Sequence, residues 1–330
     1  MTLRFGASLS LKPPAEQFDL VRRVEALGFE SVWTGDHVSF HGPIHESLTL
    51  LATYVPITSR IRLGTAVYLL ALRAPAIAAK ATATLDALSG GRLIFGVGVG
   101  GENPKEFELC GVPHRERGAR VTEGIDVVRA LWRDSPASFK GRFTQFEGVS
   151  IDPKPVQRPG PPIWIGGRSD AALTRAGRQG DGWMSYVVQP ERYAQSVEKI
   201  RAAAQAAGRR LEDFAFAHLA FITVGRDWES AKRVWVEHLS RRYAQDFEPL
   251  ARKYGIIGTP EQCAEQLARF AAAGCTDVVV NAIGAPEDER DQLERIAADV
   301  IPRLSGEGRH PRSMDAAGRR PPGGVEPHPP

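Results

Sequence analysis

The sequence predicts an α/β fold, a TIM barrel of eight parallel strands and eight helices, (β/α)8. Eight apolar runs of strand length occur along the chain, and segments with helical spacing of apolar residues separate them. The chain has 330 residues, and such a barrel needs about 250 residues, or more when it carries insertions. This count of strand–helix units favours a closed barrel over an open, doubly wound sheet.

The predicted strands are short apolar runs bounded by glycine, proline or polar residues. In chain order they are Leu3–Ser8, Ser31–Thr34, Ile61–Val67, Arg92–Gly98, Ile163–Gly166, Gly182–Ser185, Ala215–Val224 and Asp277–Asn281. Apolar stripes mark the first four helices and predict the faces that pack on the strands. The stripes are Phe18/Val21/Val24, Leu48/Leu51/Val55, Ile77/Ala81/Leu85/Leu88 and Val121/Ile125/Val128/Trp132.

Insertions are expected after the fourth and the seventh strand. Residues 139–162 predict a hairpin followed by a proline-rich connector, and residues 228–254 predict an additional helical segment. Thr259, Pro260 and Gln262 then predict a helix start with a capping box. Residues 1–304 are expected to form one barrel domain, and residues 305–330, rich in Gly, Pro and Arg, to be a disordered tail.

The composition is that of an ordinary globular protein, with 42% hydrophobic and 25% charged residues. The net charge is only +3 and basic residues are interspersed with acidic ones, so no nucleic-acid partner is expected. Cys110, Cys263 and Cys275 follow no recognised spacing and are expected to be free thiols in a reducing compartment. The chain shows no signal-peptide pattern and no apolar stretch of membrane length, which predicts a cytoplasmic protein without membrane association.

Gly96, Gly98 and Gly101 match the dinucleotide-binding pattern G-x-G-x-x-G, but their context differs from that motif. The pattern normally follows the first strand of a βαβ unit and opens a helix directly. Here it follows the fourth strand, and the next helix is expected only near Gly118. The glycines are therefore predicted to serve another ligand or a turn.

Polar and glycine-rich segments follow several predicted strands, at the end of a barrel where active sites lie. Asp36 and His37 follow the second strand, and Gly166-Gly167-Arg168-Ser169 follows the fifth. The latter segment precedes a predicted helix, whose backbone amides and dipole suit an anion such as a phosphate. A tight strand-to-helix turn without a ligand is the alternative interpretation.

Four motifs agree in order with one known family. They are Leu27–Trp33 leading to Asp36-His37, Arg62–Val67, Ser89–Gly100 continuing to Glu106-Phe107, and Pro162–Gly167 leading to Ala176–Trp183. With these motifs the chain resembles the bacterial-luciferase-like flavin and deazaflavin oxidoreductases over nearly its whole length before the tail.

The resemblance implies an enzyme that transfers a hydride between the deazaflavin coenzyme F-420 and a small organic substrate. The alternative is a two-component monooxygenase that uses reduced FMN and O2 and needs a partner flavin reductase. Asp36, directly before His37, favours the deazaflavin. The resemblance also implies a homodimer, and the segments 139–162 and 228–254 are the expected covers over the substrate.

The resemblance assigns His37 as the proton acceptor or donor, and Glu102 as a candidate catalytic residue that lines the site. It implies a non-prolyl cis peptide bond between Ala66 and Val67. Coenzyme contacts are implied for Asp36, Ala66, Val67, Val99, Gly100, Gly166, Gly167 and Arg168. The chain departs from the sugar-phosphate dehydrogenases of the family in having Phe40 and His41 shortly after His37, and Gly101 before Glu102.

Two other functions compete with this interpretation. His37, His41 and His45 stand four residues apart beside Asp36, a spacing that zinc ligands use, so a metal-dependent hydrolase is one alternative. Pro43 interrupts a continuous helix there, and no metal site is expected. A non-catalytic binding protein on the same barrel is the other alternative, because a fold does not determine a function.

Overall fold

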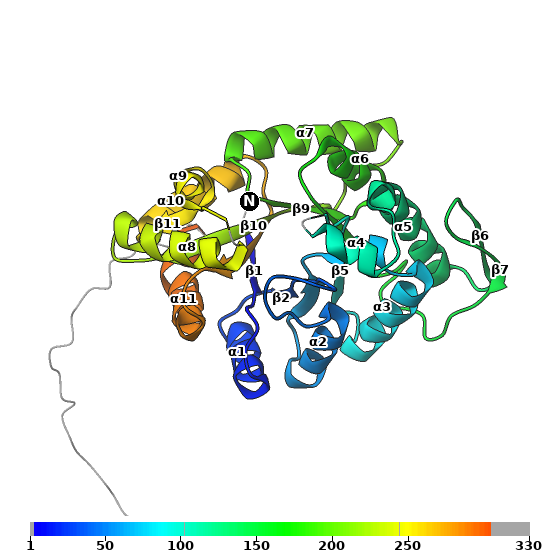
Figure 1. Ribbon diagram of the computed structural model, residues 1–330, viewed down its shortest axis with the longest axis horizontal. Coiled ribbons are helices and arrows are strands. Elements are labelled where there is room, and N and C mark those ends of the chain that lie inside the picture. Colours follow the sequence, from blue (N-terminus) through cyan, green and yellow to red (C-terminus); the bar gives the residue numbers. More distant parts are fainter. Residues whose placement is uncertain (1–2, 102, 244, 305–330) are drawn as a thin grey trace, which may run out of the picture.

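Eight parallel strands close into a barrel, as predicted, and helices surround it (Figure 1). The computed structural model describes residues 3–101, 103–243 and 245–304. Around the ring the order is β10-β12-β1-β2-β3-β5-β8-β9, and β9 pairs with β10 to close it. The barrel strands are β1 (Arg4–Ser8), β2 (Ser31–Thr34), β3 (Arg62–Thr65), β5 (Leu93–Gly98), β8 (Ile163–Gly166), β9 (Gly182–Tyr186), β10 (Ala215–Val224) and β12 (Asp277–Ala282).

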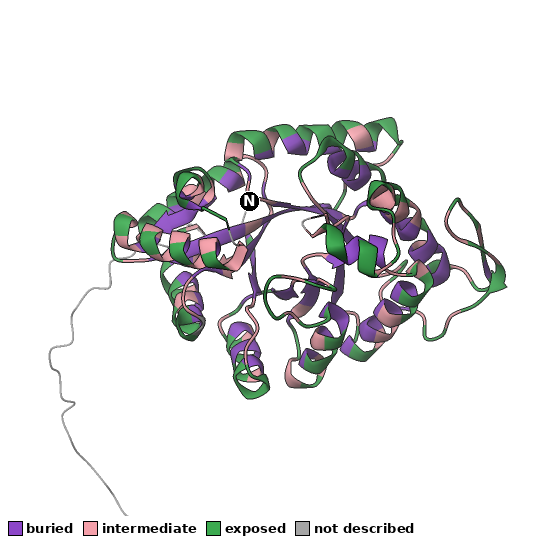
Figure 2. Cartoon of the chain, viewed as in Figure 1, coloured by how far each residue is buried: buried purple, intermediate pink, exposed green. Residues whose placement is uncertain are grey.

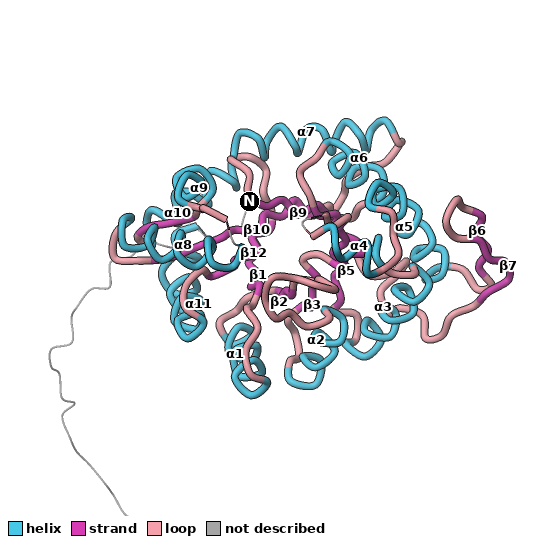
Figure 3. The backbone as a smooth tube through the Cα atoms, viewed as in Figure 1, coloured by secondary structure: helices cyan, strands magenta, loops and turns pink. Residues whose placement is uncertain are grey.

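The helices form an outer layer around the ring of strands (Figure 3). Several begin with proline in the first turn, where its missing N–H costs no helical hydrogen bond. The helices are α1 (Pro14–Ala26), α2 (Ser47–Tyr54), α3 (Pro75–Ser89), α4 (Pro104–Leu109), α5 (Arg117–Arg133), α6 (Asp170–Gln179), α7 (Pro190–Ala206), α8 (Trp228–Tyr243), α9 (Glu248–Tyr254), α10 (Pro260–Ala272), α11 (Glu289–Arg295) and α12 (Ile301–Leu304). The capping box of Thr259 and Gln262 at the start of α10 is confirmed.

The strands are buried on both faces, which explains their continuous apolar runs (Figure 2). The main core fills the space between the strands and the helices. A second cluster fills the barrel itself, where the rings of Trp33 and Trp164 lie 5.0 Å apart. A third, separate cluster packs α8 and α9 on β10 and is built on Trp235, Leu239 and Phe247.

Both predicted insertions are present. After β5, α4 and α5, the antiparallel strands β6 (Ala137–Lys140) and β7 (Gln145–Val149) form a hairpin that projects from the barrel (Figure 1). After β10, α8 and α9 precede β11 (Ile256–Gly258), which pairs with β10 outside the ring. Neither β11 nor the two-residue strand β4 (Tyr68–Leu69), which pairs with β5, was predicted.

Two sequence predictions are wrong. The apolar stripe assigned to α3 is exposed at both ends, at Ile77 and Leu88, because its alanine-rich side around Ala78 and Ala79 packs inward. The first helix after β5 was expected only near Gly118, but α4 comes before it. Asn103 caps α4 by accepting a hydrogen bond from the Lys105 amide. The predicted tail, residues 305–330, lies outside the described residues.

Candidate active site

A cavity of about 690 Å³ opens at the carboxyl ends of the barrel strands. This volume is typical of small-molecule sites. Eight of the ten site residues predicted from the sequence line it, namely Asp36, His37, Ala66, Val67, Val99, Gly100, Gly166 and Gly167. Glu102 lies outside the described residues, and Arg168 does not line the cavity. The strand ends therefore bring together residues that are up to 131 positions apart in the sequence (36 to 167).

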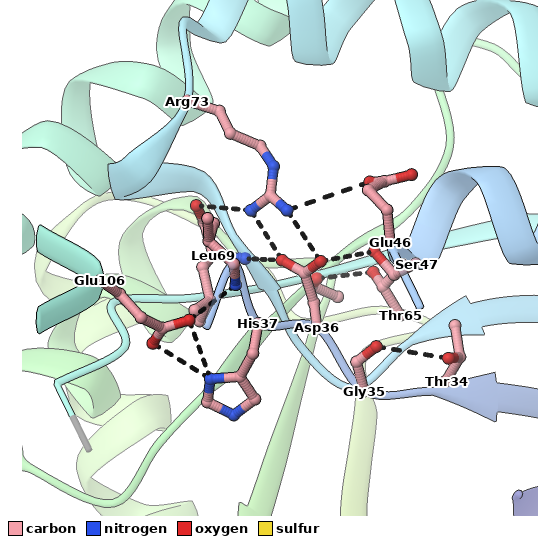
Figure 4. A network of polar contacts seen from close by, with 12 residues as sticks. Thr34, Gly35, Asp36, His37, Glu46, Ser47, Thr65, Leu69, Arg73 and Glu106 are labelled. Atoms are coloured by element: carbon pink, nitrogen blue, oxygen red, sulfur yellow. Dashed lines mark hydrogen bonds and ion pairs between the residues drawn. The ribbon is translucent and has the colours of Figure 1, made fainter. Parts of the chain in front are cut away.

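His37 lies on the cavity wall with its ring held by a buried glutamate (Figure 4). Its Nδ1 is 3.2 and 3.1 Å from the two carboxylate oxygens of Glu106, whose side chain is fully buried. Glu106 also accepts hydrogen bonds from the backbone amides of Val38 and Ser39, and the His37 ring stacks on Phe40 at 4.1 Å. A carboxylate at Nδ1 favours the tautomer with the proton on that nitrogen.

Asp36, the preceding residue, is tied into the protein by both carboxylate oxygens (Figure 4). Arg73 donates to them at 2.7 and 2.9 Å in a bidentate pair, and Ser47 Oγ and the Leu69 amide donate at 3.1 and 2.9 Å. The Arg73 guanidinium also lies 4.3 Å from the centre of the Tyr68 ring. This network fixes the turn between β2 and α2, and His37 with it, so a coenzyme contact through the Asp36 carboxylate would compete with these bonds.

Val67 forms part of the cavity wall after β3, and the peptide bond between Ala66 and Val67 is cis. The Val67 side chain lies against two glycines of neighbouring strands. A Cβ at Gly98 would be 2.3 Å from Val67 Cγ2, and a Cβ at Gly166 would be 2.7 Å from Val67 Cγ1. These two glycines thus make room for the Val67 side chain.

The glycine turn after β8 leads into α6 as predicted. Gly167 has a φ of +122°, which other residues rarely adopt. Its carbonyl accepts a hydrogen bond from Trp183 Nε1 at 2.7 Å, and Ser169 caps α6 through the Ala172 amide. The Arg168 guanidinium is directed to the carbonyl of Val187 and lies 5.3 Å from the centre of the Tyr186 ring. Tyr186 and Gly167 line the cavity, so the turn after β8 faces it.

Another histidine, His218 on β10, is outside the cavity. Its Nδ1 is 2.8 Å from Ser185 Oγ, and its ring stacks on Phe270 of α10 at 4.0 Å. Complete burial lowers the pKa of His218 from its usual 6.5 to about 3, so it stays neutral at physiological pH. It has a structural role beside the barrel.

No metal cluster forms around the three histidines of the zinc hypothesis. Within residues 3–101, 103–243 and 245–304, no group of three or more His, Cys, Asp or Glu side chains could hold a metal ion. No helix in the same ranges is long and apolar enough to cross a membrane. His41 and His45 do line the cavity, where they contribute polar groups to its rim.

The barrel and its site define a class of enzyme, the luciferase-like oxidoreductases. The sequence model described as luciferase-like monooxygenase matches residues 2–277, so the chain belongs to this family. The F420-dependent glucose-6-phosphate dehydrogenase of Amycolatopsis mediterranei is 29% identical and is matched over 90% of this chain and 98% of its own.

Relatives include enzymes of both coenzyme types. The FMNH(2)-dependent dimethylsulfone monooxygenase of Pseudomonas putida is 31% identical over 80% of this chain and 81% of its own. Among solved structures, the monooxygenase RslO1 from Streptomyces bottropensis superposes with a TM-score of 0.80 at 24% identity, over 91% of this chain and 99% of that one. These comparisons confirm the predicted fold and family and leave the coenzyme and substrate of this chain open.

Two residues of the site had no role in the sequence analysis. Glu106 is part of a family motif without an assigned role, and Arg73 belongs to none of the motifs. Their partners, His37 and Asp36, are 69 and 37 positions away, so no local spacing relates them. The only sequence signal for Glu106 is its place in the motif Glu106-Phe107. Its burial, next to the exposed Lys105 and Glu108, is visible only in the structure.

Proposed function

We propose that the protein transfers a hydride between the deazaflavin coenzyme F-420 and a small organic substrate, with His37 as the proton acceptor or donor. The observation that carries this proposal is the buried Glu106 at His37 Nδ1, on the wall of a cavity that also contains Ala66 and Val67. A carboxylate that orients a histidine and stabilises its protonated form is a recurring arrangement in general acid–base catalysis.

The residues present fit such a coenzyme. The wall formed by Ala66, Val67 and Gly100 offers an apolar surface to a planar ring. At the start of α6 the amides of Asp170 and Ala171 lack partners within the helix, and such amides suit a phosphate, whereas the Gly167 amide already donates to the Met184 carbonyl. Arg168 supplies a positive charge beside this turn. Sequence identity of 29% with an F420-dependent dehydrogenase over 90% of the chain supports the same choice.

The bound coenzyme would supply the hydride acceptor or donor, and the protein residues would supply orientation, burial and a proton site. When an alcohol loses a hydride from carbon, its hydroxyl proton must leave as well. His37 Nε2 would take that proton, and Glu106 would stabilise the resulting imidazolium across the 3.1 Å contact. In the reverse direction the same nitrogen would donate the proton. Asp36 and Arg73 would act by holding the turn that carries His37.

The second candidate is a two-component monooxygenase that uses reduced FMN, O2 and a partner flavin reductase. The 31% identity with an FMNH(2)-dependent monooxygenase over 80% of the chain favours it. The cavity would accept the ring system of either coenzyme, F-420 or FMN. A homodimer, implied by the family resemblance, and a cytoplasmic location, expected from the sequence, belong to this proposal in either form.

The proposal is tested by titrating the protein with F-420 and, separately, with FMN. Tryptophan and coenzyme fluorescence report the binding of each coenzyme. We expect tighter binding of F-420; tighter binding of FMN, with FMNH2-dependent O2 consumption, would establish the monooxygenase instead. Gly167→Ala should weaken binding, because a Cβ there is strained and lies 3.1 Å from the Ala172 side chain. Gly148→Ala is the matched control, since Gly148 also has a positive φ but lies in the β6–β7 hairpin with open space around it.

A further inference from the structure

The cavity has a second polar end, distant from the turn assigned to the coenzyme phosphate. Arg242 of α8 lines this end and donates from Nη2 to Ser10 Oγ at 3.1 Å. Ser10 follows β1, and Asn281, at the end of the neighbouring strand β12, lines the same part of the cavity. The β8 turn is four strands from β1 in either direction around the ring, so these residues lie across the barrel from it.

The side chains that line the cavity at this end carry positive charge. Glu289, which accepts a hydrogen bond from the Ser10 amide, is outside the lining and pairs with Lys12 at 3.2 Å. Two arginines of α8 line the cavity, and Arg241 forms an ion pair with Glu237 at 2.8 Å. Arg242 has no ion pair with any residue that the structure describes. Asp36 is the one described carboxylate on the cavity wall, and Arg73 already neutralises it. A partly buried guanidinium without a carboxylate partner favours a ligand that brings negative charge.

Asn281 adds an unsatisfied polar group to the same end. Its Oδ1 is buried and has no hydrogen-bond partner in the described part of the chain. Buried polar atoms are almost always paired, so this side chain indicates a ligand or water that donates a hydrogen bond. Ser10 Oγ accepts from Arg242 and keeps its own hydrogen for donation. A group with both oxyanion and hydroxyl functions would satisfy Arg242, Ser10 and Asn281 together.

Arg242 is held in place by the packing of its helix. Trp235 and Leu239 of α8 are buried in the cluster on β10, and Trp235 Nε1 donates to the Phe221 carbonyl at 3.0 Å. The guanidinium is therefore presented from a fixed support, as precise recognition of a ligand requires.

We propose that Arg242 determines substrate specificity by binding an oxyanion group, a carboxylate or a phosphate, on the substrate. The assignment to the substrate rests on the proposed function, which places the coenzyme phosphate at the opposite side of the barrel. The reacting carbon would then lie between this anion subsite and His37, and Ser10 and Asn281 would bind polar groups next to the oxyanion.

Binding of three probes of similar size tests the proposal: benzoate, phenyl phosphate and benzyl alcohol. Isothermal titration calorimetry on the full chain, with and without saturating coenzyme, gives the affinity of each. We expect one of the two anions to bind at least about ten-fold tighter than benzyl alcohol, as for a charge-assisted contact. The better anion distinguishes a carboxylate from a phosphate subsite.

Variants at two positions of α8 complete the test. Arg242→Gln should remove the preference for the anion, and Arg242→Lys should retain part of it. Arg233→Gln removes the same charge from an exposed position of the same helix outside the cavity and should leave the preference intact. Equal melting temperatures would exclude a folding defect as the cause.

Three results would overturn the proposal: no anion preference in the wild type, a preference that survives Arg242→Gln, or anions that compete with the coenzyme. The last result would assign Arg242 to the coenzyme. Failure of both F-420 and FMN to bind, with the anion preference intact in the coenzyme-free protein, would instead contradict the proposed function.

Discussion

Replacement of Arg73 by methionine tests how much the hydrogen bonds to the Asp36 carboxylate stabilise the folded protein. Asp36 is fully buried, and Arg73 makes two of the four hydrogen bonds to its carboxylate. Methionine keeps the unbranched apolar stem and removes the guanidinium with its charge, so the buried carboxylate retains Ser47 and the Leu69 amide as its described hydrogen-bond partners. Breaking a buried pair in this way costs about 3–5 kcal/mol, and we expect the free energy of unfolding to fall by that amount.

Urea unfolding at neutral pH, followed by tryptophan fluorescence, measures the change. Arg22→Met is the matched control, because Arg22 pairs with Asp19 at the surface, with side chains 53% and 63% exposed. Such a pair contributes about 0–1 kcal/mol. The double variant Asp36→Asn/Arg73→Met should lose less than the sum of the single losses, since the neutral amide needs no counterion. Equal losses for Arg73→Met and Arg22→Met would refute the reasoning.

Three further substitutions give separate predictions. Glu106→Gln should lower kcat by about 10²–10⁴-fold and leave coenzyme affinity unchanged, because the amide stabilises the wrong tautomer of His37; steady-state kinetics and the fluorescence titration measure both. Gly98→Ala should destabilise the protein by about 1–3 kcal/mol in urea unfolding, because the new methyl group meets Val67 at 2.3 Å. The pKa of His218 is about 3 in the folded protein, so its contribution to stability is complete above pH 6.5 and falls by about 1.4 kcal/mol per pH unit below it. His218→Phe should therefore make the free energy of unfolding less dependent on pH between 6.5 and 4.

Each of these has a contrary result. An unchanged kcat in Glu106→Gln would contradict the orienting role of Glu106. Unchanged stability in Gly98→Ala would show that the residues around Val67 can shift to accommodate a methyl group. Parallel pH profiles of wild type and His218→Phe would mean that His218 does not resist protonation in the folded state.

The strands were the most predictable part of the fold. Parallel barrel strands are buried on both faces, so each appears in the sequence as an uninterrupted apolar run, and all eight were found. Strands β4 and β11 have two and three residues, and their existence depends on pairing with β5 and β10, which no local pattern encodes. The prediction of the buried face of α3 failed because alanine residues give little contrast in hydrophobicity between the two faces of a helix.

The site was predictable where the family motifs are contiguous and not where distant residues meet. Asp36, His37, Gly166 and Gly167 lie directly after strands, and barrel geometry places such residues around one cavity. Arg242 reaches that cavity from an inserted helix, and its position depends on how Trp235 and Leu239 pack. Long-range packing of this kind has no signature in local spacing.

The separate apolar cluster beneath α8 and α9 has a consequence for the evolution of this enzyme. Trp235, Leu239 and Phe247 pack with Phe221 of β10 and do not belong to the main core. Mutations on the cavity-facing side of α8 can therefore accumulate without disturbing the eight-stranded frame or the His37–Glu106 pair. If Arg242 binds the substrate as proposed, changes confined to this module would alter substrate choice and leave the His37–Glu106 pair in place.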